Sequence, residues 1–212
     1  MKPIRYFIVK VDKPVNDTIH VAGEDMYLDT RFNEFAHRAF DGEVMGVPER
    51  YDTGVSIGDT LYFHHHVVLG GNHMVYGNRQ LNTATDRKGQ FVYADKNLYY
   101  VTWDGGYDPF SCQAYAYKSK ETGEVRLLGD WIFLTPAPQE DELESEVLEI
   151  VQTKKTYNQY GYVRYSSTKL EELGLSPGDK VFIQKNSDYE MEINGERLYR
   201  VLLTHIYAQV QE

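Results

Sequence analysis

Three consecutive histidines, His64, His65 and His66, with His73 nearby, come closer to a metal site than any other residues of this sequence. If the preceding strand continues through the triplet, strand alternation places His64 and His66 on one face, as a metal ion would require. Adjacent histidines alone are weak evidence, and no cysteine lies nearby to complete a ligand set. We therefore expect exposed hairpin histidines, no bound metal and no cofactor.

Other patterns that could do chemistry are absent from the sequence. The single cysteine, Cys112, excludes an internal disulfide and has no obvious local base to activate it. No Gly-x-Ser-x-Gly, His-Glu-x-x-His or Walker pattern is present. The glycine pairs at 70–71 and 105–106 are interpreted as hairpin turns, because no helix that could bind phosphate is predicted after them. We expect a protein that is not an enzyme, and a metal-dependent enzyme built on the histidines remains a third hypothesis.

Composition excludes two classes of partner. The net charge is −10 and no basic stripe is present, so the sequence offers no electrostatic footprint for nucleic acid. Hydrophobic residues make up 42% of the chain, which is enough to form packed cores. Residues 1–10 are too often interrupted by charge for a signal peptide, and no apolar run has the length of a membrane span. We expect a cytoplasmic protein without membrane contact.

One strand pattern occurs twice in the chain. Residues 55–63 read Val-Ser-Ile-Gly-Asp-Thr-Leu-Tyr-Phe, and residues 175–183 read Leu-Ser-Pro-Gly-Asp-Lys-Val-Phe-Ile. Upstream, residues 4–10 and 128–134 are predicted to be matching opening strands, each followed by a proline-bearing segment. The repetition, together with runs of β-branched and aromatic residues separated by Gly, Asn and Asp, predicts an all-β protein built from two related copies.

The two copies are also predicted to end alike, with residues 98–101 and 206–210 as their closing strands. Between the copies, alternating segments flank Lys-Glu-Thr-Gly, which is a hairpin signal. The expected organisation is a first barrel at 1–103, an inserted β-hairpin at 104–127 and a second barrel at 128–212.

The order of these landmarks resembles that of the GroES-type co-chaperonins, the chaperonin-10 family. Its landmarks are an opening strand, a long loop, a Gly-Glu-Val strand, a Val-x-x-Gly-Asp-x-Val strand and a closing Ile-x-Ala-x-Val strand. In this chain Gly-Glu-Val stands at 42–44, and Ile-Tyr-Ala-Gln-Val ends the second copy at 206–210. Similar tandem forms occur in plastids and divergent single ones in phages. The resemblance implies two tandem GroES-like β-barrels joined by the inserted hairpin, in a divergent, phage-like form.

The resemblance also implies a function. Such proteins form homo-oligomeric rings that cap a chaperonin-60 (GroEL-like) chamber holding an unfolded client protein, and they dock through a loop with an apolar anchor. The corresponding loop here is 12–41. Weak single contacts, repeated around a ring, would give a tight but reversible lid. The chaperonin-binding candidates are Met26, Tyr27 and Leu28, with Ile19 and Val21 as a second set; a plain barrel strand is the alternative interpretation of Met26 to Leu28.

Two features leave the function open. The corresponding stretch of the second copy, 136–160, is acidic and has no glycine, so we expect it to support the structure and not to dock. The alternative function is a structural or assembly protein, such as a virion component, that uses the barrels without chaperonin binding. The tyrosine-rich segment 104–127 motivates that alternative, because tyrosine is enriched at protein contacts.

Overall fold

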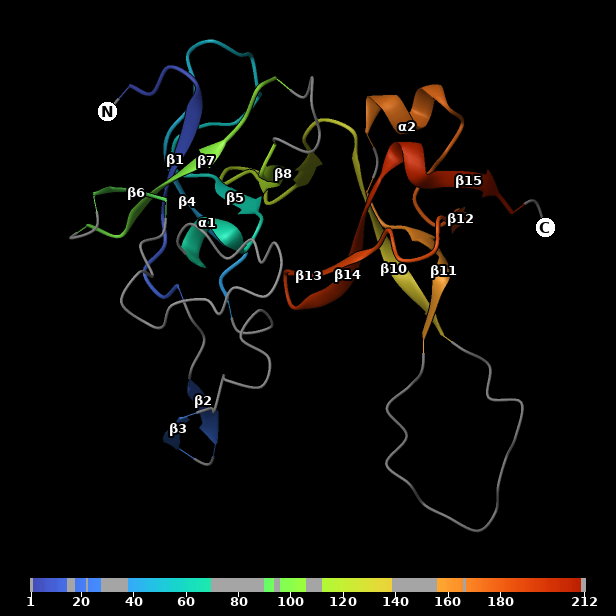
Figure 1. Cartoon of the computed structure of the whole chain (residues 1–212), viewed down its shortest axis with the longest axis horizontal. Helices are drawn as coiled ribbons and strands as arrows, with labels where there is room; N and C mark the ends of the chain where they lie inside the picture. Colours follow the sequence, from blue (N-terminus) through green and yellow to red (C-terminus); the bar gives the residue numbers. More distant parts are fainter. Residues whose placement is uncertain are drawn as a thin grey trace, which may run out of the picture. The chain divides into compact units, whose positions relative to one another are not determined.

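The computed structural model describes residues 2–14, 18–21, 23–27, 38–69, 90–93, 96–105, 112–138, 156–165 and 167–210. The chain divides into two compact units, Met1–Gly129 and Asp130–Glu212 (Figure 1). Each unit contains one large antiparallel sheet, which confirms the all-β class. Within the described ranges, no helix has the length and apolar character needed to cross a membrane.

The large sheet of the first unit has seven described strands. Their order is β6 (Phe91–Tyr93), β7 (Leu98–Thr102), β1 (Tyr6–Lys10), β4 (Asp41–Gly46), β5 (Thr60–Phe63), β8 (Ala114–Lys118) and β9 (Val125–Leu127). Alternate residues of β1, Phe7 and Val9, enter the core together with Leu61 and Phe63 of β5. A short helix, α1 (His66–Leu69), follows β5 and adds Val67 to the same core.

The first unit also contains a separate two-stranded sheet, formed by β2 (Thr18–Val21) and β3 (Glu24–Tyr27). Both strands come from the long connection between β1 and β4. The strands pair antiparallel around Gly23, whose φ of +90° favours glycine at the turn.

The sheet of the second unit has six described strands. Their order is β13 (Tyr189–Ile193), β14 (Glu196–Leu202), β10 (Trp131–Pro138), β11 (Thr156–Val163), β12 (Lys180–Ile183) and β15 (Ile206–Gln209). Helix α2 (Thr168–Glu172) begins after Ser167, whose hydroxyl accepts a hydrogen bond from the Leu170 N–H, and the single turn η4 (Leu203–His205) precedes β15.

The two sheets correspond strand by strand. When β9 is left aside, the order β6-β7-β1-β4-β5-β8 in the first unit corresponds to the order β13-β14-β10-β11-β12-β15 in the second. In this alignment the opening strands β1 and β10 correspond, and so do β5 and β12, which follow the Gly-Asp pairs. Tyr62 lies opposite Ala116 where β5 pairs with β8, and Phe182 lies opposite Ala208 where β12 pairs with β15. In both pairs the register shifts at the next residue, so even the β-bulge is repeated.

This correspondence changes the expected closing strand of the first copy. We expected residues 98–101 in that role and 104–127 as an insertion. Residues 98–101 instead belong to β7, the counterpart of β14, and the counterpart of β15 is β8. Within the large sheet of the first unit, only β9 lacks a counterpart among the described strands of the second unit.

The sheets differ from the expectation of closed barrels. In the described parts of the chain, the two outer strands of each sheet do not pair with each other, so neither sheet closes onto itself. The coarse prediction of two related β units is supported by the strand order, whereas closed GroES-like barrels are not confirmed.

Candidate functional site

The β2–β3 hairpin brings the two sets of candidate docking residues together. Ile19 lies opposite Met26 and Val21 lies opposite Glu24, so the segments that the sequence presented as alternatives are paired strands of one hairpin. Leu28 lies outside the described residues, as does the acidic loop of the second copy at 139–155.

The apolar side chains described on this hairpin face solvent. The exposed fractions are 46% for Val21, 53% for Met26 and 84% for Tyr27. All four residues of β3 are exposed, so β3 is not a strand of a packed barrel wall. Large apolar side chains on a short exposed hairpin are suited to contact with an apolar groove on another protein.

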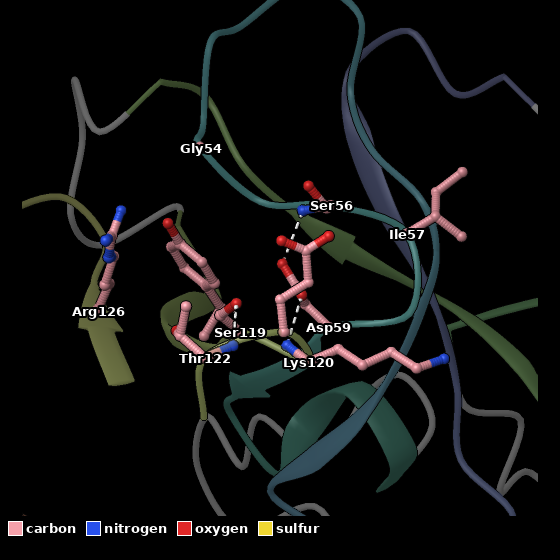
Figure 2. Close-up of a pocket in the computed structure, with 10 residues that line it drawn as sticks. Gly54, Ser56, Ile57, Asp59, Ser119, Lys120, Thr122 and Arg126 are labelled. Carbon is pink, nitrogen blue, oxygen red and sulfur yellow. Dashed lines mark hydrogen bonds between the residues drawn. The ribbon is translucent and has the colours of Figure 1, made fainter. Parts of the chain in front are cut away.

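The repeated Gly-Asp turn forms a second candidate site, and in the first unit it is held by a buried carboxylate. Asp59 is 4% exposed, and its Oδ2 accepts a hydrogen bond of 2.8 Å from the Ser56 N–H. Its Oδ1 accepts one of 2.9 Å from the Lys120 N–H, in the turn between β8 and β9 (Figure 2). A single side chain therefore joins the Gly-Asp turn to a hairpin more than sixty residues later.

A shallow pocket of about 310 Å³ lies over this turn and is lined mainly by polar side chains. Asp59 is unsuited to act there as a general base, because both of its oxygens already accept backbone hydrogen bonds. Arg126 is bound to Glu124 through Nε and Nη2, and hydrogen bonds to Glu124 and Tyr117 raise the pKa of its guanidinium. The pocket is therefore interpreted as the surface above a structural link, in which Asp59 joins the Gly-Asp turn to the β8–β9 turn.

The second unit repeats the Gly-Asp turn but not its backbone link to a following hairpin. Oδ2 of Asp179 accepts a hydrogen bond of 2.8 Å from the Ser176 N–H, as Asp59 does from Ser56. Its further partner is the side chain of Gln209, whose Nε2 donates at 2.9 Å. The φ angles of Gly58 and Gly178 are +93° and +96°, which explains why both turns carry glycine.

No family model matches this chain, and no curated protein matches it. The equivalence of the two units rests on the hydrogen bonds and the strand order within the chain.

The histidines do not continue β5 as expected. β5 ends at Phe63, and His66 is the first residue of α1, so strand alternation does not place His64 and His66. The triplet is also not a set of exposed hairpin residues, because His65 is only 5% exposed. The three rings nevertheless cluster, with centroid distances of 4.2 to 4.4 Å. His73 lies outside the described residues.

The other residues singled out in the sequence, Cys112 and the tyrosines of β8, are buried. Cys112 is buried and its thiol lies 2.8 Å from Oδ1 of Asp104. Tyr115 and Tyr117, which motivated a contact surface at 104–127, are 2% and 5% exposed. These two tyrosines belong to the buried part of β8 and offer no docking surface.

Proposed function

We propose that this chain is a co-chaperonin-like protein, a homo-oligomeric lid that docks on a GroEL-type chaperonin-60 ring and assists the folding of client proteins. The exposed β2–β3 hairpin is the observation that carries the proposal. It stands between the opening strand and the Gly-Glu-Val strand, where co-chaperonins carry their docking loop, and it presents Met26 and Tyr27 to solvent.

The internal repeat supports the proposal, because both copies keep the Gly-Asp turn and a glycine in the strand before it. The Gly-Asp turn has the same backbone bonds in each unit: Gly58 donates to the Val44 carbonyl at 2.8 Å, and Gly178 donates to the Val163 carbonyl at 2.7 Å. Gly42 of the Gly-Glu-Val strand and Gly161 of β11 both pack against a backbone carbonyl of the opening strand. The finer statement, two GroES-like barrels, is part of this proposal.

An open sheet edge supports the oligomeric part of the proposal. In the first unit the outer edge of β8 is paired with β9, and β9 leads directly into β10, the opening strand of the second copy. In the described part of the second unit, β15 pairs with β12 and with no second strand, and Tyr207 is 69% exposed. An edge strand of this kind is available to pair with a neighbouring chain in the proposed ring.

The docking assignment is tested by mixing the full chain with a GroEL-type ring and nucleotide and measuring complex formation by light scattering and electron microscopy. We expect capped rings with the wild-type chain. Met26→Ser with Tyr27→Ser should weaken the complex by roughly tenfold or more, because a small loss per loop is multiplied over the ring.

Leu173→Ser is the matched control, because Leu173 is 61% exposed but lies at the end of α2 in the second unit. Its affinity for the ring should equal that of the wild type. Equal weakening by both variants would overturn the hairpin assignment. A wild-type chain that is monomeric in solution, or that forms no complex, would overturn the proposed function itself.

A further inference from the structure

The three histidine rings after β5 are arranged closely enough to hold one ion. The centroid distances are 4.3 Å for His64 and His65, 4.2 Å for His64 and His66, and 4.4 Å for His65 and His66. One ring nitrogen from each residue lies within 4.8 Å of the other two. Zinc bound at about 2.0–2.1 Å would bring such nitrogens to about 3.3 Å from one another in a tetrahedron, so the rings must move closer together when the ion binds.

The backbone that carries these rings is fixed on both sides. The His64 N–H donates to the Gln113 carbonyl of the neighbouring chain segment at 2.9 Å. The His64 carbonyl accepts from Val67 at 3.0 Å, and Val67 is fully buried in the core. The histidine rings also have aromatic neighbours. The ring centroids of Tyr115 and His64 are 6.3 Å apart, and those of Phe40 and His65 are 6.2 Å apart. The cluster therefore sits on a supported turn, which favours a defined ligand geometry.

The second unit shows that the fold does not require histidines at this position. Residues 184–186, Gln-Lys-Asn, follow β12 as the histidines follow β5. The Gln184 N–H donates to the His205 carbonyl at 2.9 Å, the same bond that His64 makes to Gln113. The first hydrogen bond of this turn thus forms without an imidazole, although the backbones differ at the third residue, where His66 begins α1 and Asn186 has a φ of +60°.

We propose that His64, His65 and His66 bind one divalent transition-metal ion of the zinc class. Three neutral imidazoles are a ligand set that suits Zn²⁺, Co²⁺, Ni²⁺ or Cu²⁺, with a water molecule in the remaining position. The net charge of −10 favours the approach of a cation. The ion would tie the end of β5 to the start of α1.

Metal binding has a structural cost at His64. Its Nδ1 accepts a hydrogen bond of 3.1 Å from the His66 N–H. A neutral ring that accepts at Nδ1 carries its proton on Nε2, so metal coordination by either nitrogen requires this contact to open. Binding of the ion therefore requires this one contact to open, and it does not require either backbone hydrogen bond of His64 to change.

The experiment uses the full chain, stripped of metal with a chelator and then dialysed. Titration with Co²⁺, followed by visible absorption, and with Zn²⁺, followed by calorimetry, should each show one ion per chain. His66→Gln, at an exposed position, should lower the association constant by roughly tenfold or more, because one ligand is removed. His64→Gln should have a similar effect.

His205→Gln is the matched control, since His205 adjoins the equivalent turn of the second unit. It should bind metal as the wild type does, and circular dichroism should show that all three variants remain folded. A wild-type chain without saturable one-to-one binding would overturn the proposal. The same conclusion follows if His66→Gln binds as tightly as the wild type, or if His205→Gln weakens binding equally.

Discussion

Asp59 in the first unit and Asp179 in the second hold the same turn with the same hydrogen bond, yet each carboxylate joins that turn to a different kind of group. Asp59 accepts from the backbone of Lys120 and is buried, whereas Asp179 accepts from the side chain of Gln209 and is partly exposed. The turn itself is thus maintained in both units. What differs is how firmly the turn is attached to the rest of its sheet.

The difference follows from β9. In the first unit the chain continues from β8 through a tight turn into β9, and this turn supplies the Lys120 N–H above the carboxylate. In the second unit no described strand follows β15, and the partner that Asp179 has outside its own turn is the side chain of Gln209. The segment that follows the final strand of each unit therefore determines how strongly the repeated Gly-Asp turn is attached to its sheet.

The largest expected effect distinguishes the two carboxylates. Asp59→Ala should lower the free energy of unfolding of the first unit by about 3 kcal/mol, because two backbone donors lose a charged acceptor at a buried position. Asp179→Ala should lower that of the second unit by about 1 kcal/mol, since water replaces the acceptor for an exposed amide. Equal losses would contradict the comparison.

The two tryptophans make this measurement possible, because Trp103 lies in the core of the first unit and Trp131 in the second unit. Urea unfolding is followed by Trp103 fluorescence in a Trp131→Phe background and by Trp131 fluorescence in a Trp103→Phe background. Asp59→Asn is the internal control. It keeps one acceptor oxygen, so its loss should lie between those of the wild type and Asp59→Ala.

A second pair of substitutions tests the equivalence of the units. A Cβ at Gly42 would lie 2.8 Å from the Lys10 carbonyl oxygen, and one at Gly161 would lie 2.9 Å from the Thr135 carbonyl oxygen. Each alanine should therefore force two strands apart and cost about 1–3 kcal/mol in its own unit, measured by the same urea unfolding.

Gly46→Ala is the control for this pair, because its nearest neighbour is the ring of Pro3, 3.0 Å away near the start of the chain. This contact is longer than those at Gly42 and Gly161 and is made to a side-chain ring and not to a strand backbone, so the loss should be smaller. A large loss at Gly42 with none at Gly161 would show that β4 and β11 are not equivalent.

The smallest expected effect concerns alkaline stability. Burial raises the pKa of the Tyr99 hydroxyl, and the positive charge of Arg38 opposes part of this shift. The folded state thus favours neutral Tyr99, which gives a stabilisation present below about pH 10 and lost as the pH rises through the higher folded pKa. Tyr99→Phe should flatten the alkaline fall of the first unit's urea midpoint and leave the second unit unchanged. An unaltered slope in the first unit would contradict this assignment.

The sequence predicted the local features of this fold and missed the pairings between distant segments. The Gly-Asp strands and the hairpin around Lys120 were predicted from turn residues and alternation, and they are confirmed as β5, β12 and β8–β9. That β8 is the counterpart of β15 was missed, because pairing with β5 depends on residues far away in the chain.

A shift of one residue also separates the expected and observed opening strands. The sequence alignment of residues 4–10 with 128–134 makes Lys10 the equivalent of Leu134. In the sheets the equivalent of Leu134 is Val9, because Val9 lies opposite Tyr99 and Leu134 lies opposite Tyr199. Side chains alternate along a strand, so this shift exchanges the buried and exposed faces. The histidines were misplaced for a related reason: the end of β5 at Phe63 is determined by the core packing of α1, which alternation does not reveal.

The antiparallel pairing of β8 with β5 also determines when the first unit can be completed during protein synthesis. β1 pairs with β7, and β5 with β8, so the sheet lacks two of its inner contacts until residues 98–118 have left the ribosome. Leu128 belongs to the same core, and Trp131 already starts the next sheet. The first unit therefore becomes complete only as translation of the second begins, and during that interval its unfinished edge is open to mispairing.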